Sequence, residues 1–263
     1  MTHRTIAAVV ALFGFAACNN EGPQLGQMSV RLTDAPNPGI ASAMVWVSRV
    51  SLVGGGAPVD ISTTPTQYDL LSLQGGVTAA LGSALIPVGD YEQLRLVVDS
   101  ARITLAGSAT FSDGSNTRTL KVPSGMQSGI KVNFSGPVHV APGQTVLVVD
   151  FDASRSFVFT GSGASPNGAL FKPVLHATAQ DVAGSVSGVV TPDSAHAHVF
   201  AISGAADTVA STSADSTGAY SLRFLAPGSY TIAAAATGFK SATQPVTVGA
   251  AQNVTGVNFA LTH

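Results

Sequence analysis

Three aspartates have the residue type and spacing that could bind a hard cation. Asp150 and Asp152 lie two residues apart in the stretch VVDFDAS, so on a strand both would point to the same face. Together with Asp34 in LTDAP, they would offer carboxylate oxygens to calcium, which takes several oxygen ligands. We favour the simpler interpretation, in which these aspartates accept hydrogen bonds from turn amides or face solvent. No cofactor is therefore expected, and calcium is the alternative.

Two histidines form a second candidate metal site. His196 and His198 in HAHVF would share one face of a strand and could hold a transition metal, which suits imidazole ligands. The favoured interpretation is again the simpler one, with both histidines at exposed polar positions on an edge strand.

No motif for catalysis is present in the sequence. It contains no G-x-S-x-G turn for a nucleophilic serine and no H-E-x-x-H pair for zinc. The chain has two glutamates, Glu21 and Glu92, so the carboxylate pair of a glycosidase would have to come from aspartates, and no two of them stand out as acid and base. We therefore expect a non-enzymatic protein, with a hydrolase as the remote alternative.

The charge of the chain excludes one class of partner. Charged residues make up 10% of the chain, the net charge is −2, and no two Lys or Arg residues are adjacent. A protein that binds nucleic acid needs a basic stripe to displace counterions. No nucleic-acid partner is expected.

The elements that would position these side chains are strands. Apolar and polar residues alternate in MSVRLTD (28–34) and YEQLRLVVDSARITL (91–105), which is the period of a strand with one buried face. Turn signals such as DAPNPG and SDGSN separate such runs. The one short helix that we expect is GVTAALGS, residues 76–83. Many short strands with Gly- and Pro-rich turns are typical of an all-β sandwich or barrel.

The first residues predict export. The apolar run TIAAVVALFGFAA (5–17) is shorter than the roughly twenty residues that cross a bilayer, and it suits the apolar region of a secretory signal. The stretch Phe15-Ala16-Ala17-Cys18, which contains the only cysteine, resembles the lipobox of bacterial lipoproteins. This resemblance implies cleavage before Cys18 and acylation of its thiol. Asn19 after the cysteine resembles the pattern of lipoproteins sent to the outer membrane. An ordinary signal peptide with an incidental cysteine is the alternative.

The C-terminal part of the chain resembles a carboxypeptidase regulatory-like domain. The residues that carry the resemblance are GSVSGVV, DSTGAYSLRFLAPGSYTIAAAATGFKS and the closing VTGVNFALT. The resemblance implies a transthyretin-like (prealbumin-like) Greek-key sandwich of about seven strands. The zinc-dependent catalytic domain of carboxypeptidases has no counterpart in the chain.

The preceding part resembles an uncharacterised bacterial lipoprotein family, domain of unknown function 4382. The resemblance implies an extracytoplasmic β domain and no activity. It is carried, in order, by VRLTDAP, YDLLSLQGGVTAALGSALIPVGDYEQLRL, VPSGMQSGIKV and LVVDFDASRSFVFTGSG with FKPVL.

We therefore predict an all-β protein with two β-sandwich-like domains. The expected segments are a signal peptide at 1–17, a polar tether with lipidated Cys18 at 18–27, the first β domain at 28–181 and the regulatory-like sandwich at 184–263. The N-terminal lipid would hold the protein to the outer membrane, and an envelope protein or a glycan would be its partner.

The aromatic residues decide between those two partners. Trp46 falls in phase with Val50 and Leu52, which predicts a core position, and Tyr220 and Tyr230 are also expected to pack. Sugar sites stack rings on exposed aromatics. The favoured function is therefore a structural or protein-interaction module, and glycan binding at the cell surface is the alternative.

Overall fold

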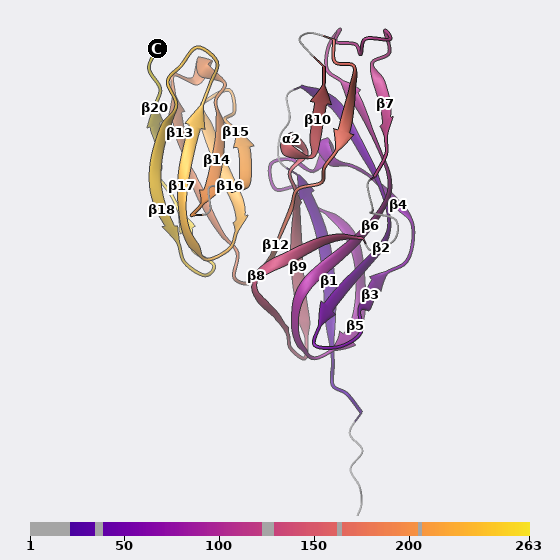
Figure 1. Cartoon of the computed structure of the whole chain (residues 1–263). Coiled ribbons are helices and arrows are strands. Elements are labelled where there is room, and N and C mark those ends of the chain that lie inside the picture. The colour runs from indigo at the N-terminus through magenta and orange to yellow at the C-terminus, as the bar shows by residue number, and fades with distance from the viewer. Residues whose placement is uncertain (1–21, 35–38, 123–128, 162–164, 205–206) are drawn as a thin grey trace, which may run out of the picture.

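The protein is nearly all β, as its residue pattern predicts. The structure, a computed structural model, describes residues 22–34, 39–122, 129–161, 165–204 and 207–263. Its strands gather into two units that lie side by side (Figure 1). The signal peptide and Cys18 lie outside the described residues.

The first unit contains strands β1 to β12 and two short helical turns. Their bounds are β1 Leu25–Asp34, β2 Ile40–Gly54, β3 Val59–Ser62, β4 Thr66–Asp69, η1 Leu70–Leu73, β5 Ala79–Pro87, β6 Gly89–Leu105, β7 Thr117–Leu120, β8 Ile130–Val140, β9 Gln144–Phe151, α2 Ala153–Ser156, β10 Phe157–Thr160, β11 Gly168–Phe171 and β12 Leu175–Ala179.

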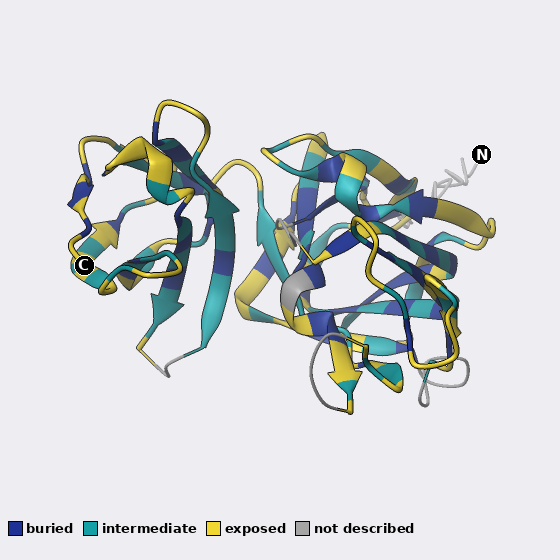
Figure 2. Ribbon diagram, turned by 90° about the horizontal axis from the view of Figure 1, so that it is seen from above, coloured by how far each residue is buried: buried dark blue, intermediate teal, exposed yellow. Residues whose placement is uncertain are grey.

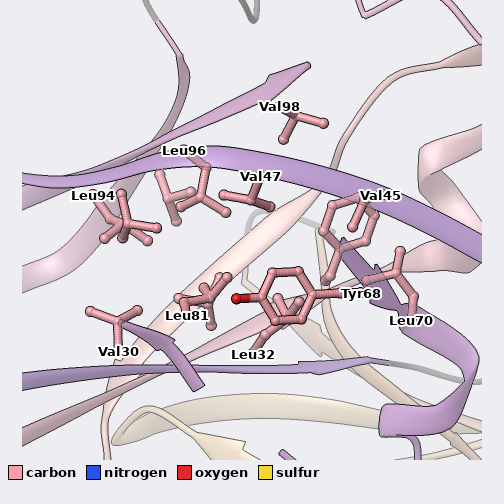
Figure 3. Packing of buried hydrophobic residues seen from close by; sticks show 14 of the residues in the cluster. Val30, Leu32, Val45, Val47, Tyr68, Leu70, Leu81, Leu94, Leu96 and Val98 are labelled. Atoms are coloured by element: carbon pink, nitrogen blue, oxygen red, sulfur yellow. The ribbon is translucent and has the colours of Figure 1, made fainter. Parts of the chain in front are cut away.

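Two sheets enclose the core of the first unit. One has the order β12-β9-β1-β5, and the other has the order β3-β2-β6-β7, with β4 also paired to β2 and β8 to β6. The alternation expected in the sequence holds, because Val30 and Leu32 of β1 are buried, as are Leu94 and Leu96 of β6. Figure 3 shows these side chains packed between the layers. Burying one face of each sheet against the other is the main favourable contribution to such a fold.

The segment expected to be a helix, residues 76–83, is not helical. Its second half belongs to β5, which pairs antiparallel with β1 from Leu25↔Pro87 to Leu32↔Ala79. Leu81 is buried in the core. Gly82 lies so close to β3 that an added Cβ would come within 2.7 Å of the Cβ of Ser62. Pairing with β1 and close packing against β3 therefore outweigh the helix propensity of the alanines.

Trp46 is on the outer face of its sheet, and its expected place in the core is wrong. Val45 and Val47 point inward, whereas further along β2 it is Val50 and Leu52 that do so. Between them, at Val47 to Arg49, β2 has one residue more than its partner β6. A bulge adds a residue and shifts the alternation by one, so counting back in steps of two from Leu52 assigns Trp46 to the wrong face.

The second unit contains β13 to β20. Their bounds are β13 Gly184–Thr191, η2 Asp193–Ala195, β14 His198–Ser203, β15 Thr208–Ser213, β16 Ala219–Leu225, β17 Gly228–Ala235, β18 Ala242–Val248, β19 Asn253–Val254 and β20 Phe259–Ala260.

This unit is a sandwich of two sheets. One sheet has the order β15-β14-β17-β18, and the other has β16-β13-β19, with β20 also paired to β13. Because β19 and β20 run parallel to β13 one after the other, they act as one interrupted strand, which brings the unit to the seven strands expected. Tyr220 and Tyr230 are buried in its core, as predicted. Their hydroxyls donate to the carbonyls of Val257 and Ala226, each at 2.6 Å.

Within the described part of the chain, no helix is long and apolar enough to cross a membrane.

Candidate functional site

The two units meet at a crevice that is the best candidate for a functional site. A cavity of about 290 Å³ opens between them, lined by β8, β9 and β12 of the first unit and by β14 to β17 of the second. The link between the units is short, because β12 ends at Ala179 and β13 begins at Gly184. Figure 2 shows both units from above, with exposed and half-buried strands facing each other across this boundary.

Asp150 and His176 lie directly opposite each other on the wall of the crevice. They are register partners in the antiparallel pair β9 and β12, so both side chains point to the same face of the sheet. Both also line the cavity. Asp150 was singled out from the sequence, but His176 was not, because no local signal shows which residue of β12 pairs with Asp150.

The carboxyl group of Asp150 has an unusual protonation equilibrium. Burial raises its pKa to about 7, and the nearby carboxylate of Asp152 adds to the increase. Among the described residues, no hydrogen bond or ion pair involves the Asp150 side chain. A group with this pKa changes its charge near neutral pH.

His176 is held neutral in the same wall. Burial lowers its pKa, and the opposing effects of Asp207, Asp152 and the Thr208 backbone are smaller. Its Nε2 is buried and has no hydrogen-bond partner within the described residues.

Arg155 connects the two units beside this pair. Its Nη1 donates to Oδ1 of Asp207 at 2.7 Å and to the carbonyl oxygen of Thr208 at 2.8 Å. Arg155 belongs to the short helix α2, which begins where β9 ends. Asp152 caps this helix, since its Oδ1 accepts a hydrogen bond from the Arg155 amide at 3.1 Å.

Asp34 also supports α2 from the neighbouring strand. Its Oδ1 accepts a hydrogen bond from the Ala153 amide at 3.1 Å, and Asp34 pairs in register with Phe151 next to Asp150. The three aspartates named for calcium are therefore neighbours, but two of them hold a helix. No group of three His, Cys, Asp or Glu side chains in the described ranges is placed to hold a metal ion.

A bulge shapes the opposite wall of the crevice. The pairing of β13 and β16 is irregular between Gly184 and Val186, and Phe224 on the bulged strand has a φ of 57°. This left-handed conformation is costly for a residue with a bulky side chain. It places Phe224 in the lining of the cavity, and its neighbour Arg223 lies against the first unit, where an added Cβ on Gly76 would meet Arg223 Cδ at 2.6 Å.

The second histidine pair does not share a strand face. His196 follows the turn η2 in a left-handed conformation with a φ of 46°, whereas His198 begins β14 and its Nδ1 lies 3.1 Å from Ser213 Oγ. The expected edge position is also wrong, because β14 lies between β15 and β17. The sequence alternation did not reveal that the turn η2 ends at His196 and that β14 begins only at His198.

Two family models match the chain, one for each unit. The model described as domain of unknown function (DUF4382) matches residues 25–173, and the carboxypeptidase regulatory-like domain matches residues 185–262. No protein with a curated description matches the sequence.

The solved structures similar to this chain include proteins of three bacteria. The Bacillus anthracis TIE protein is 8% identical over 91% of this chain and 51% of its own, with a TM-score of 0.27. The minor pilin GBS52 of Streptococcus agalactiae is 11% identical over 89% and 95%, with a TM-score of 0.25. The shaft pilin SpaA of Lactobacillus rhamnosus GG is 6% identical over 91% and 98%, with a TM-score of 0.24.

Proposed function

We propose that this chain, which belongs to the family described as domain of unknown function 4382, is a non-enzymatic lipoprotein of the cell envelope that binds other envelope proteins. A carboxypeptidase regulatory-like domain follows the family domain. Cys18 would carry the lipid, and residues 18–27 would form the tether to the outer membrane. The sequence Phe15-Ala16-Ala17-Cys18 supports this anchor.

The observation that carries this proposal is an exposed apolar hairpin at the end of the first unit opposite the tether. The strands β10 and β11 form a separate two-stranded sheet, and Figure 1 shows it at the end of the unit far from where β1 begins. Val158 and Leu170 are register partners on one face of this hairpin and are 39% and 48% exposed, and Phe159 on its other face is 38% exposed. Apolar patches of this kind commonly mark interaction surfaces.

The hairpin also borders a groove with open strand edges. A cavity of about 390 Å³ lies between β7 and β11, and consecutive residues of both strands line it. Each of these strands pairs on one side only among the described strands. Lys121 and Lys172 line the groove, and neither forms an ion pair within the described residues. An extended, acidic segment of a partner would form backbone hydrogen bonds with the open strand edges and ion pairs with Lys121 and Lys172.

Crosslinking in cells tests the proposal. A photoreactive residue at Leu170 is expected to capture one envelope protein, and the double substitution Val158→Thr with Lys172→Glu is expected to abolish that capture. A photoreactive residue at Leu85, which is 64% exposed and lies away from the hairpin on β5, is the matched control. Equal capture from both positions would contradict the proposal.

Trp46 favours glycan binding as a second candidate function. Its ring is half-buried on the outer face of the sheet, with the Arg102 guanidinium 5.4 Å from the ring centroid. Gln67 and Ser100 are its register partners on either side. An aromatic ring flanked by hydrogen-bonding side chains is suited to stack on a sugar. Saturable binding to a panel of envelope polysaccharides that is lost in Trp46→Ala would support this candidate.

A further inference from the structure

We infer that the crevice between the two units binds an organic cation, with an ammonium group on the carboxylate of Asp150 and a partly apolar body against Phe224. This site goes beyond the proposed interaction with envelope proteins and does not depend on it.

The crevice has the size and lining of a small-ligand site. Its volume of about 290 Å³ is close to the lower end of small-molecule pockets, which span about 300 to 1,000 Å³. Most of its wall is apolar, with Val148 and Phe134 on one side and Val209 and Leu225 on the other. Such a pocket favours a ligand with an apolar body and few polar groups.

The carboxylate of Asp150 is the acidic group that lacks a partner in this wall, within the described residues. It is only partly shielded from solvent, and it lines both the crevice and the adjoining small cavity that contains Asp34 and Arg223. No described residue donates a hydrogen bond to it. A carboxylate in an apolar wall is strongly stabilised by a cation that enters beside it.

The charged groups around Asp150 favour a positive ligand. Asp34 and Asp152 lie on its own side and are held by the amides of α2. Arg155 is engaged by Asp207, and Arg223 lies against Gly76. His176 opposite is kept neutral by burial. Of these charges, that of Asp152 acts on the Asp150 carboxyl and raises its pKa, so a positive ligand is favoured beside it.

The aromatic wall is suited to the same ligand. Phe224, Phe134 and Tyr230 all line the crevice, and the faces of aromatic rings attract ammonium groups. The unfavourable backbone of Phe224, with its φ of 57°, holds this ring in the wall. Strained backbone of this kind commonly occurs where a ligand binds.

The protonation of Asp150 makes the binding depend on pH. Its pKa of about 7 means that the ionised fraction rises from about 0.1 at pH 6 to about 0.9 at pH 8. The affinity for an ammonium ion is therefore expected to rise about tenfold over that interval. A neutral ligand would show no such increase.

Calorimetric titration of the full-length protein in a non-ionic detergent tests the site, with n-butylammonium as the probe and n-butanol as its neutral counterpart. We expect saturable binding of the amine, at least about tenfold tighter than that of the alcohol. Asp150→Asn should lose that difference, and Asp193→Asn, on the exposed turn η2, should keep it. An NMR titration of the Asp150 carboxyl should show its pKa falling when the amine binds.

A capped lysine peptide and its acetyl-lysine form distinguish the two sources of the ammonium. Binding of the lysine peptide would identify the side chain of a partner protein as the ligand, whereas binding of the free amine alone would identify a small molecule. Either result supports the site. Equal binding of butanol and butylammonium, unchanged binding in Asp150→Asn, or no saturable binding at pH 8 would overturn it.

Discussion

Arg155 of the first unit and Asp207 of the second form an ion pair across the crevice, with 2.7 Å between Nη1 and Oδ1. The same guanidinium nitrogen also donates to the carbonyl of Thr208. The link at residues 180–183 is short, so this pair is placed to set the angle between the units. Helix α2 presents Arg155 at the boundary, and Asp34 and Asp152 support the helix.

Arg155→Ala is expected to broaden the range of distances between the units. The pair is partly exposed, so the free energy of unfolding should fall by less than about 1 kcal/mol. With spin labels at Leu85 and Val189, one on each unit, double electron–electron resonance spectroscopy would measure the distribution of distances between the two labels. Arg118→Ala, which removes an ion pair within the first unit, is the control. An unchanged distribution in Arg155→Ala would show that the pair does not orient the units.

Asp150→Asn is expected to stabilise the first unit at pH 8. The folded state raises the pKa of Asp150 from 3.8 to about 7, so between these values the folded protein binds a proton that the unfolded chain has released. Stability therefore falls as pH rises from about 4 to about 7, by roughly 2 to 4 kcal/mol. Denaturant unfolding would measure the free energy of unfolding at pH 5 and at pH 8. The difference between these two free energies should be smaller in Asp150→Asn. A variant with the same pH dependence as the parent protein would rule out Asp150 as its source.

Asp152→Ala is expected to weaken α2 whether or not calcium is present. Removing the capping carboxylate should lower the free energy of unfolding by about 1 kcal/mol, and the position of Arg155 should become less defined. Thermal unfolding with added calcium and with a chelator would separate the cap from a metal site. A parent protein that loses stability in the chelator would favour the calcium interpretation instead.

Gly188→Ala is expected to destabilise the second unit. An added Cβ would lie 1.9 Å from the carbonyl oxygen of Val257, and that oxygen also accepts the hydrogen bond from Tyr220. The chain between β19 and β20 would have to move, at a cost of about 1 to 3 kcal/mol. Gly204→Ala, where no atom lies within 4 Å of the added Cβ, should unfold like the parent protein. Similar unfolding midpoints for the two variants would contradict the close approach.

The strands with one buried face could be predicted from the sequence. In β1 and β6 the alternation follows the pleat, because side chains on a strand point to opposite faces in turn. The residues Val30, Leu32, Leu94 and Leu96 are accordingly buried. Wherever a bulge or turn interrupts this period, as beside Trp46 and His196, the local pattern indicates the wrong face.

The sequence by itself therefore determined the all-β architecture, because it follows from local periodicity and turn residues. The order of the two units follows from the motifs by which each part resembles its family. Tertiary structure alone decided which residues form the crevice. Asp150 and His176 are opposite each other only through the register of β9 and β12, and Phe224 lines the same cavity from a bulge in the other unit. Register and the docking of two sheets depend on contacts between residues far apart in the chain, and no local pattern encodes them.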